Sequence, residues 1–250
     1  RRRLDRLDPE AQTLASVGAV FGEFSTLLVA TVSELPVSDV LGALDRLIEQ
    51  RVIEPIPGLA DHYQFAHPLL REAALRDIGA ARTASIALAA AEYLSAQPTP
   101  SARQIDRRAE LWFRALPLAP LGRVETELDK AAEAAYARND HHQRIVHLRR
   151  RIQITESAGQ PVPIATRVDL AEASADAQIE AGVRRQRARI AFDAAADNGD
   201  GILMARAALA FGGPFNPFGS LVTVDEESES MARRALAMGD TSLELQAQLW

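Results

Sequence analysis

Three histidines lie close together in the sequence, at His141, His142 and His147, and they are the first candidates for a metal site. Zinc-binding histidines on a helix usually stand four residues apart, so that both rings face one metal, with a glutamate between them. None of these three histidines has that spacing, and no H-E-x-x-H pattern surrounds them. The chain also has no cysteine, so no thiolate is present to bind zinc or to act as a nucleophile. We therefore expect no metal site.

Glycine-rich segments can form phosphate or calcium loops, but those in this chain are incomplete. No G-x-x-x-x-G-K-[ST] motif occurs, and the prolines in 212–219 lack the amide hydrogens that a phosphate loop donates. The segment 197–201 has glycine at the third position of a calcium loop, and no glutamate follows at the twelfth. We interpret 212–219 as a loop between helices, with Phe215 and Phe218 either packed inward or forming a contact surface, and Gly199 as a helix end.

Nothing in the sequence indicates catalysis. No Ser-His-Asp or Cys-His order is tied to a strand-turn-helix, and no defined pair of carboxylates suggests acid-base chemistry. We therefore expect a protein that is not an enzyme, with no catalytic residue and no cofactor bound by this chain alone.

Length and composition limit the remaining classes. At 250 residues the chain is long enough for one or two domains, and we expect two. A net charge of -6 argues against a general nucleic-acid binder, and no apolar run approaches the ~20 residues of a membrane-spanning helix. We expect a cytoplasmic protein without a membrane partner. The chain begins at Arg1 rather than Met and 245–250 continue a helical pattern, so we expect a piece of a longer protein.

Abundant alanine and few aromatic residues favour packed helices over a β-sandwich or barrel. In the first part of the chain, Asp8 and Pro9 are suited to open a helix that Gly22 ends. Alternation of period two is confined to one region, where it predicts a β-hairpin. The expected elements are helices from Pro9 to Gly22, over 25–32 and from Ser38, a hairpin of 52–56 and 62–65 with its turn at 57–61, and helices over 68–77 and 80–96. Three helices followed by a hairpin is the order of a winged-helix domain.

Winged helices often bind DNA through the third helix, so the charges of that helix decide whether this function is open. Its apolar residues predict one buried face, formed by Val40, Leu41, Leu44, Leu47 and Ile48. Its charged residues are mixed and mostly acidic, namely Asp39, Asp45, Arg46, Glu49 and Arg51. Because DNA phosphates repel carboxylates, we expect this helix to pack within a protein-protein module rather than to enter a groove.

Beyond Pro100 the pattern is one of paired helices. In the pair that begins at Ile164, Gly182 is predicted to break the chain, and Ala188, Phe192 and Ala195 follow at the spacing of a tetratricopeptide second helix. The first helix of this pair is about one turn too long for the consensus, so we expect degenerate repeats. The predicted helices cover 101–115, 119–138, 141–156, 164–181, 184–198, 200–211 and 225–238.

We therefore predict a mainly α chain with two domains. Residues 1–96 form a winged-helix-like domain with one small β-hairpin and a linking helix, and 97–250 form a truncated region of tetratricopeptide-like helical hairpins. Two groups of arginines fall on second helices of the predicted hairpins, and we interpret them as solvated faces or, alternatively, as surfaces for an acidic partner or a nucleotide-binding domain. They are Arg144, Arg149, Arg150 and Arg151, and Arg184, Arg185, Arg187 and Arg189.

Four segments resemble one known family, the signal-transduction ATPases with numerous domains, and especially the LuxR-type large ATP-binding regulators and their MalT-like relatives. The segments are LDRLDPEA at 4–11, AVFG at 19–22, VLGALDRL at 40–47 and YQFAHPLLRE at 63–72. They look like the winged-helix domain that follows the nucleotide-binding core of that family, and the helical remainder is similar to its repeat sensor. The resemblance implies ATP or ADP as a cofactor of the full-length protein, bound outside this chain.

The same resemblance assigns a role to His67. In that family the histidine of a Phe-x-His motif reaches the β-phosphate of bound ADP and holds the closed state, and Arg71 is placed to assist from the same helix. The alternative for His67 is that it caps the helix that follows or satisfies a buried carbonyl group.

The function that this reasoning predicts is regulatory. The winged helix is expected to control an upstream nucleotide-binding domain of the same protein, while the repeats sense a protein or a small molecule. Two rival classes stay open, a stand-alone scaffold of repeats and a regulator that binds DNA through the winged helix.

Overall fold

The computed structural model describes residue 4 and residues 7–76, 78–98, 100–212 and 226–239. These residues are mainly helical, with one small antiparallel sheet. Two compact units are formed, Arg1–Glu127 and Leu128–Trp250, and each is described by itself. The domain boundary that the sequence predicts after residue 96 marks the end of the winged-helix-like module and not the limit of a compact unit, so it stays a prediction.

The first unit begins with the predicted helix α1 (Pro9–Phe21). The Asp8 side chain caps it by accepting a hydrogen bond of 2.9 Å from the backbone amide of Ala11. Gly22 ends it with a φ of 83°, a left-handed conformation that glycine adopts without steric cost. The helix is buried over most of its length, so it forms the centre of the unit.

Two more helices follow, α2 (Thr26–Ser33) and α3 (Val37–Glu49), and both contact α1. The predicted buried face of α3 is confirmed for Val40, Leu44 and Leu47, which are almost wholly buried. The prediction is wrong for Leu41, whose side chain is 48% exposed. At 100° per residue, Leu41 falls outside the narrow arc that faces α1 and α2, and it lies instead on the side of α3 that carries Val37 and Asp45.

The sheet confirms the predicted hairpin and adds a strand that the sequence did not predict. Its strands are β1 (Glu23–Ser25), β2 (Ile53–Pro55) and β3 (His62–Phe65), in the order β1-β3-β2 with antiparallel pairing throughout. In β1, Phe24 is buried and its ring lies 6.1 Å from that of Tyr63 and 6.5 Å from that of Phe65. These ring contacts fix β1 on the edge of the hairpin.

Three helices complete the unit, α4 (Pro68–Arg76), α5 (Ala80–Ser95) and α6 (Ala102–Arg114). Helix α4 packs on α1, α5 on α1 and α2, and α6 on α5, where the Trp112 indole donates a hydrogen bond of 3.2 Å to the Ser95 hydroxyl. The unit ends inside α7 (Leu121–Ala137) at Glu127. This carboxylate is only 1% exposed and pairs with the guanidinium of Arg108 at 2.5 Å and with that of Arg123 at 3.3 Å.

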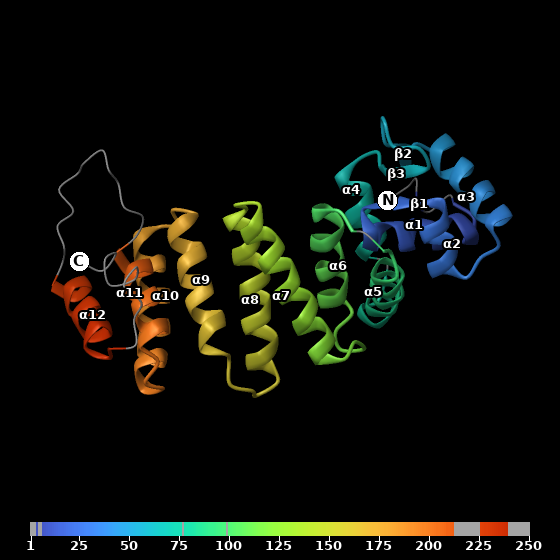
Figure 1. Ribbon diagram of the computed structural model, residues 1–250. Coiled ribbons are helices and arrows are strands. Elements are labelled where there is room, and N and C mark those ends of the chain that lie inside the picture. The colour runs from blue at the N-terminus through green and yellow to red at the C-terminus, as the bar shows by residue number, and fades with distance from the viewer. Residues whose placement is uncertain (1–3, 5–6, 77, 99, 213–225, 240–250) are drawn as a thin grey trace. The chain divides into compact units, whose positions relative to one another are not determined.

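The second unit is a stack of helical hairpins (Figure 1). After the rest of α7 it contains α8 (His141–Ser157), α9 (Ile164–Asp176), α10 (Ala181–Asp197), α11 (Gly201–Gly212) and α12 (Glu226–Ala237). Helix α9 contacts α8, α10 and α11, and α11 also contacts α10 and α12. The predicted face of Ala188, Phe192 and Ala195 is buried in this core. Each helix pair therefore buries the apolar face of its neighbour, as in helical-repeat proteins.

Two details of the predicted repeats are wrong. Gly182 does not break the chain but lies in the first turn of α10, because the Glu180 side chain caps that helix by accepting a hydrogen bond of 3.3 Å from the Gly182 amide. The turn before it takes its positive φ of 52° at Gln178 instead. Helix α9 ends at Asp176 rather than 181, so it is not one turn too long. Apart from Gly212, the predicted loop 212–219, with Phe215 and Phe218, lies outside the described residues, as does 245–250.

Within the described ranges, no single helix is both long and apolar enough to cross a membrane; α2 and α3 pass such a test only together, across a bend of 117°.

Gly18, in the last two turns of α1, allows the sheet to approach this helix closely. A β-carbon at this position would lie 2.6 Å from an edge carbon of the buried Phe24 ring. We expect Gly18→Ala to destabilise the chain by about 1–3 kcal/mol through overpacking, as measured by urea unfolding. Gly42→Ala is the matched control, because its nearest neighbour is the flexible end of Arg46 at 3.4 Å. It should leave stability unchanged or raise it by up to about 1 kcal/mol; equal effects of the two substitutions would contradict this packing.

Candidate functional site

His67 stands at the N-cap of α4 and is exposed. Its Nδ1 atom accepts a hydrogen bond of 3.2 Å from the backbone amide of Leu69, so the structure shows the capping contact that was one of its two predicted roles. An imidazole that accepts on Nδ1 carries the proton of the neutral ring on Nε2. The cap therefore leaves His67 with a hydrogen-bond donor on the opposite side of the ring.

Arg71 lies one turn further along α4, and its side chain reaches the end of α1. The guanidinium Nε donates a hydrogen bond of 2.9 Å to the carbonyl oxygen of Ala19. It also lies over Gly22, where a β-carbon would be 3.2 Å from the Arg71 Cζ. The absence of a side chain at Gly22 thus leaves the space that Arg71 occupies, and Arg71 satisfies a carbonyl that the last turn of α1 leaves without a helical partner.

A second arginine, which the sequence analysis missed, joins Arg71 at this helix end. The Nη2 atom of Arg107 on α6 donates a hydrogen bond of 3.3 Å to the carbonyl oxygen of Val20, the residue next to Ala19. Burial, together with the charges of Arg71 and Arg114, lowers the pKa of Arg107 to about 10, while Glu110 and Glu23 act in the opposite direction. Burial and the charge of Arg114 lower the pKa of Arg71 as well.

We call Arg71, Arg107 and Arg114 the arginine cluster. Its carboxylate neighbours are already paired, because Glu110 accepts a hydrogen bond of 2.6 Å from Arg114 Nε and Glu23 pairs with Arg103. A signal for the cluster exists in the sequence, since positions 103, 107, 110 and 114 recur at helical spacing and place three arginines on one face of α6. What the sequence does not show is that this face meets the end of α1.

In the second unit, the arginines of the first predicted solvated face are partly internal. Arg144 and Arg151 are buried, so the solvated-face interpretation is wrong for these two. Arg144 pairs with Asp169 of α9 at 3.2 Å, and Arg151 pairs with Asp129 of α7 at 3.3 Å. These ion pairs join α8 to the helices on either side of it.

Arg206 of α11 completes this charge network. Its guanidinium forms a two-pronged pair with Glu172, with both hydrogen bonds at 2.7 Å, and a third hydrogen bond of 2.8 Å with Asp169. The hydrogen bonds to Glu172 are the main reason that the pKa of Arg206 is raised above its usual value. Because Asp169 also pairs with Arg144, one carboxylate of α9 links α8 and α11.

The second arginine group on α10 is also engaged within the unit. Arg189 forms a two-pronged pair with Glu227 of α12, with hydrogen bonds of 2.6 and 2.7 Å. Arg187 donates a hydrogen bond of 2.7 Å to the Ser174 hydroxyl of α9, and burial followed by the charge of Arg149 lowers its pKa. These contacts hold hairpins together.

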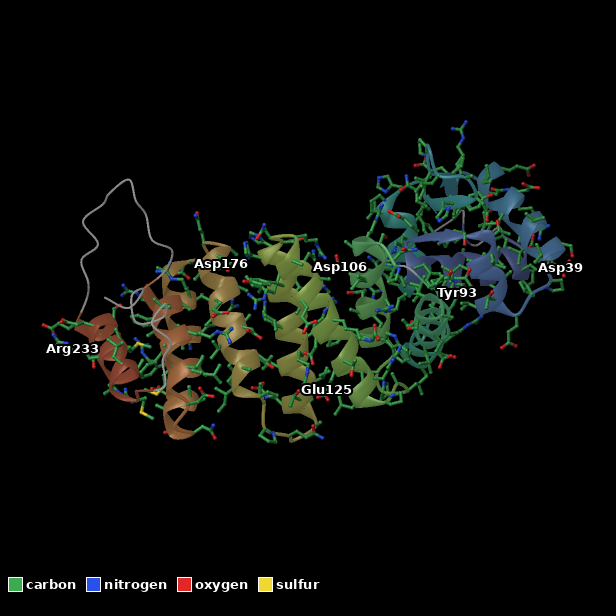
Figure 2. All side chains as sticks on the ribbon, in the orientation of Figure 1. Asp39, Tyr93, Asp106, Glu125, Asp176 and Arg233 are labelled. Carbon is green, nitrogen blue, oxygen red and sulfur yellow. The ribbon has the colours of Figure 1, made fainter. Side chains whose placement is uncertain are left out.

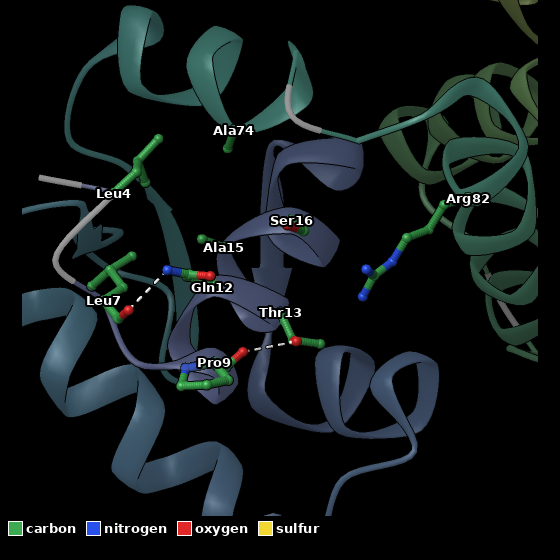
Figure 3. Close-up of a pocket in the computed structure, with 9 residues that line it drawn as sticks. All are labelled: Leu4, Leu7, Pro9, Gln12, Thr13, Ala15, Ser16, Ala74 and Arg82. Carbon is green, nitrogen blue, oxygen red and sulfur yellow. Dashed lines mark hydrogen bonds between the residues drawn. The ribbon is translucent and has the colours of Figure 1, made fainter. Parts of the chain in front are cut away.

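A surface hollow of about 380 Å³ lies at the start of α1 (Figure 3). Its polar side chains include Gln12, which donates to the Leu7 carbonyl at 2.9 Å, and Thr13, which donates to the Pro9 carbonyl at 2.9 Å. Both bonds stay within the segment that forms the wall, so they stabilise the wall. The lining residues are Leu4, Leu7, Pro9, Gln12, Thr13, Ala15, Ser16, Ala74 and Arg82.

The three histidines of α8 are not brought together at a metal centre. His141 Nδ1 lies 3.5 Å from a carboxylate oxygen of Asp176, His142 is exposed and His147 is buried. Within the part of the chain that the structure describes, no group of three or more histidine, aspartate and glutamate side chains is placed to hold a metal ion.

Neither the known family models nor the curated proteins include a match to this chain. Among solved structures, the chain is similar to a signal transduction ATPase with numerous domains (STAND) protein with a tetratricopeptide repeat sensor from Pyrococcus horikoshii. The identity is 13% and the TM-score 0.34, and the match covers 94% of this chain and 45% of that one. This chain therefore spans less than half the length of that protein, and a likeness at this level carries no argument about function.

The charge network predicts an unequal response to the loss of two arginines. Arg206→Ala removes the pairs with Glu172 and Asp169, and we expect a loss of about 1–2 kcal/mol in the free energy of unfolding. Arg233→Ala is the matched control, because it removes only the exposed pair with Glu229 within α12. That control should cost less than about 0.5 kcal/mol. Urea unfolding of both variants measures the difference, and similar values would mean that the network does not hold the hairpins.

Proposed function

We propose that this chain is the regulatory, non-catalytic part of a multidomain signal-transduction ATPase. In this proposal a winged-helix domain in the first unit controls a nucleotide-binding domain of the same protein, and the helical hairpins of the second unit bind an effector. The observation that carries it is the first unit's element order, α1-β1-α2-α3-β2-β3, with the sheet order β1-β3-β2. Both orders are those of a winged-helix domain, and they occur on the residues that resemble the LuxR-type and MalT-like regulators.

His67 supplies the proposed link to the nucleotide. Because its Nδ1 is used by the cap of α4, the Nε2–H is a donor with a fixed ring orientation. A donor of this kind suits a phosphate oxygen of ADP held by the neighbouring domain. The contact would exist only in the closed arrangement, so ADP would favour that arrangement and slow its opening.

The second unit supports the sensing role. Stacked hairpins leave extended surfaces, and this unit carries exposed apolar side chains at Val146, Ile190 and Ile202. An effector, either a protein or a small molecule, that binds such a surface better in the open arrangement shifts the population away from the closed one.

DNA binding through the winged helix is the less favourable alternative. The exposed side of α3 carries Asp39, which projects from the helix in Figure 2, together with Asp45 and Glu49. Arg46, which could offset them, is held by Asp8 at 2.5 Å and Glu10 at 2.9 Å. The surface that would enter a DNA groove therefore presents carboxylates to phosphates.

The proposed role of His67 is tested in the complete protein with His67→Asn. Asparagine keeps the N-cap because its side-chain oxygen accepts from the backbone, but it lacks the distal N–H. We expect ADP to dissociate about 10- to 100-fold faster, because one charge-assisted hydrogen bond is lost. A fluorescent ADP analogue measures this dissociation rate. His62→Asn, an exposed histidine of β3, is the control. If His67→Asn keeps the wild-type rate while His67→Ala only lowers stability, capping is the whole role of His67.

A separate measurement addresses the DNA-binding alternative. We expect the isolated chain to show no binding to duplex DNA by fluorescence anisotropy at any ionic strength down to about 50 mM salt, since its third helix repels phosphates. Reversing the charges with Asp45→Arg and Glu49→Arg provides the comparison variant. Tight wild-type binding that weakens steeply with salt would replace the proposed function with a DNA-binding one.

A further inference from the structure

The arginine cluster brings several positive charges together at the end of α1. Of its three guanidinium groups, Arg114 has a carboxylate partner in Glu110. Among the residues that the structure describes, Arg71 and Arg107 have no carboxylate within ion-pair distance, and their hydrogen bonds go to backbone carbonyls. The partial negative charge at the end of α1 offsets only part of two full positive charges.

Helix capping accounts for one hydrogen bond from each of these two side chains and leaves further donors on each. Each uses one N–H on a carbonyl of α1, Arg71 through Nε and Arg107 through Nη2. A guanidinium has further N–H donors in a planar fork, and in Arg71 both Nη groups are left over. Ala19 and Val20 are consecutive residues, so both guanidinium groups are anchored at the same helix end, near enough for the charge of Arg71 to help lower the pKa of Arg107.

The two side chains are also accessible. Arg71 and Arg107 are both of intermediate exposure, so part of each residue is open to solvent. Their environment still disfavours the charged state, since burial and the neighbouring arginines lower the pKa of both. A bound anion would offset this repulsion with its own charge.

We propose that Arg71 and Arg107 form a binding site for a phosphate-type oxyanion, located where α4 and α6 meet the last turn of α1. Tetrahedral oxyanions present several acceptor oxygens, which match two adjacent guanidinium forks. Gly22 contributes by lacking a side chain beside Arg71. The site lies within the first unit and needs neither another domain nor His67; it shares only Arg71 with the nucleotide contact that the family resemblance implies.

The phosphate has two possible sources, the free ion or the phosphate group of a nucleotide. Titrations of the 250-residue chain with inorganic phosphate, pyrophosphate, ADP and adenosine separate them. If ADP binds no more tightly than pyrophosphate and adenosine does not bind, the site recognises the phosphate groups alone. If ADP binds more tightly than pyrophosphate, the site takes a nucleotide.

The test compares the thermal midpoint with and without phosphate, at an ionic strength matched with chloride. We expect phosphate to raise the wild-type midpoint by at least about 2 °C, and calorimetric affinity for pyrophosphate to fall about 10- to 100-fold in Arg107→Ala and in Arg71→Ala. Arg76→Ala is the matched control, because Arg76 lies on α4 and pairs only with the exposed Glu72. Its affinity should equal that of the wild type.

Each variant is compared with its own ligand-free midpoint, so that a loss of capping is not mistaken for a loss of binding. If either alanine variant fails to fold, Arg71→Lys and Arg107→Lys retain the charge but lose the planar fork, and we expect about tenfold weaker binding. No phosphate-specific stabilisation of the wild type, or equal stabilisation of the wild type and the folded cluster variants, would overturn the proposal.

Discussion

The last turn of α1 is the constraint on which the first unit depends. A buried helix must satisfy its final carbonyl groups, and its own chain cannot do so after Gly22 turns away into β1. Arg71 and Arg107 supply donors from α4 and α6, and this brings two helices that are distant in sequence to the same point. The same turn sets the direction of β1, so Phe24 meets the hairpin rings. One helix end thereby positions the sheet, the N-terminus of α4 and the arginine cluster.

In the second unit, arginines join neighbouring helices to one another through ion pairs. Its helices bury many alanines, which allow close approach but provide little apolar area per contact. Ion pairs between helices supply orientation, because the Arg206 fork accepts only a narrow range of carboxylate positions at Glu172 and Asp169. Replacing such pairs by apolar side chains of similar volume need not lower stability, so the advantage of ion pairs over apolar contacts lies in fixing the register of the hairpins.

Local signals in the sequence predicted most of the helices and the hairpin, because caps, glycines and helical spacing act within a few residues. The edge strand β1 was missed, since three residues with one buried side chain give no periodic signal. The break at Gly182 was misplaced because Gln178 takes the left-handed conformation that glycine usually provides. For the candidate site, the sequence led to His67 and Arg71, but Arg107 was missed. Its partner is a carbonyl 87 residues away in sequence, and no residue type marks such an oxygen.

The charge of α3 bears on how an arrangement of three helices and a small sheet could act without DNA. A helix that enters a groove needs a basic, polar surface, whereas the exposed side of α3 combines Val37 and Leu41 with Asp45 and Glu49. Apolar side chains left in water favour association with another apolar surface, and the carboxylates restrict that surface to one that is not acidic. The same order of helices and strands can therefore present a surface suited to protein contacts, because the fold depends on the buried side of α3 and the function on its exposed side.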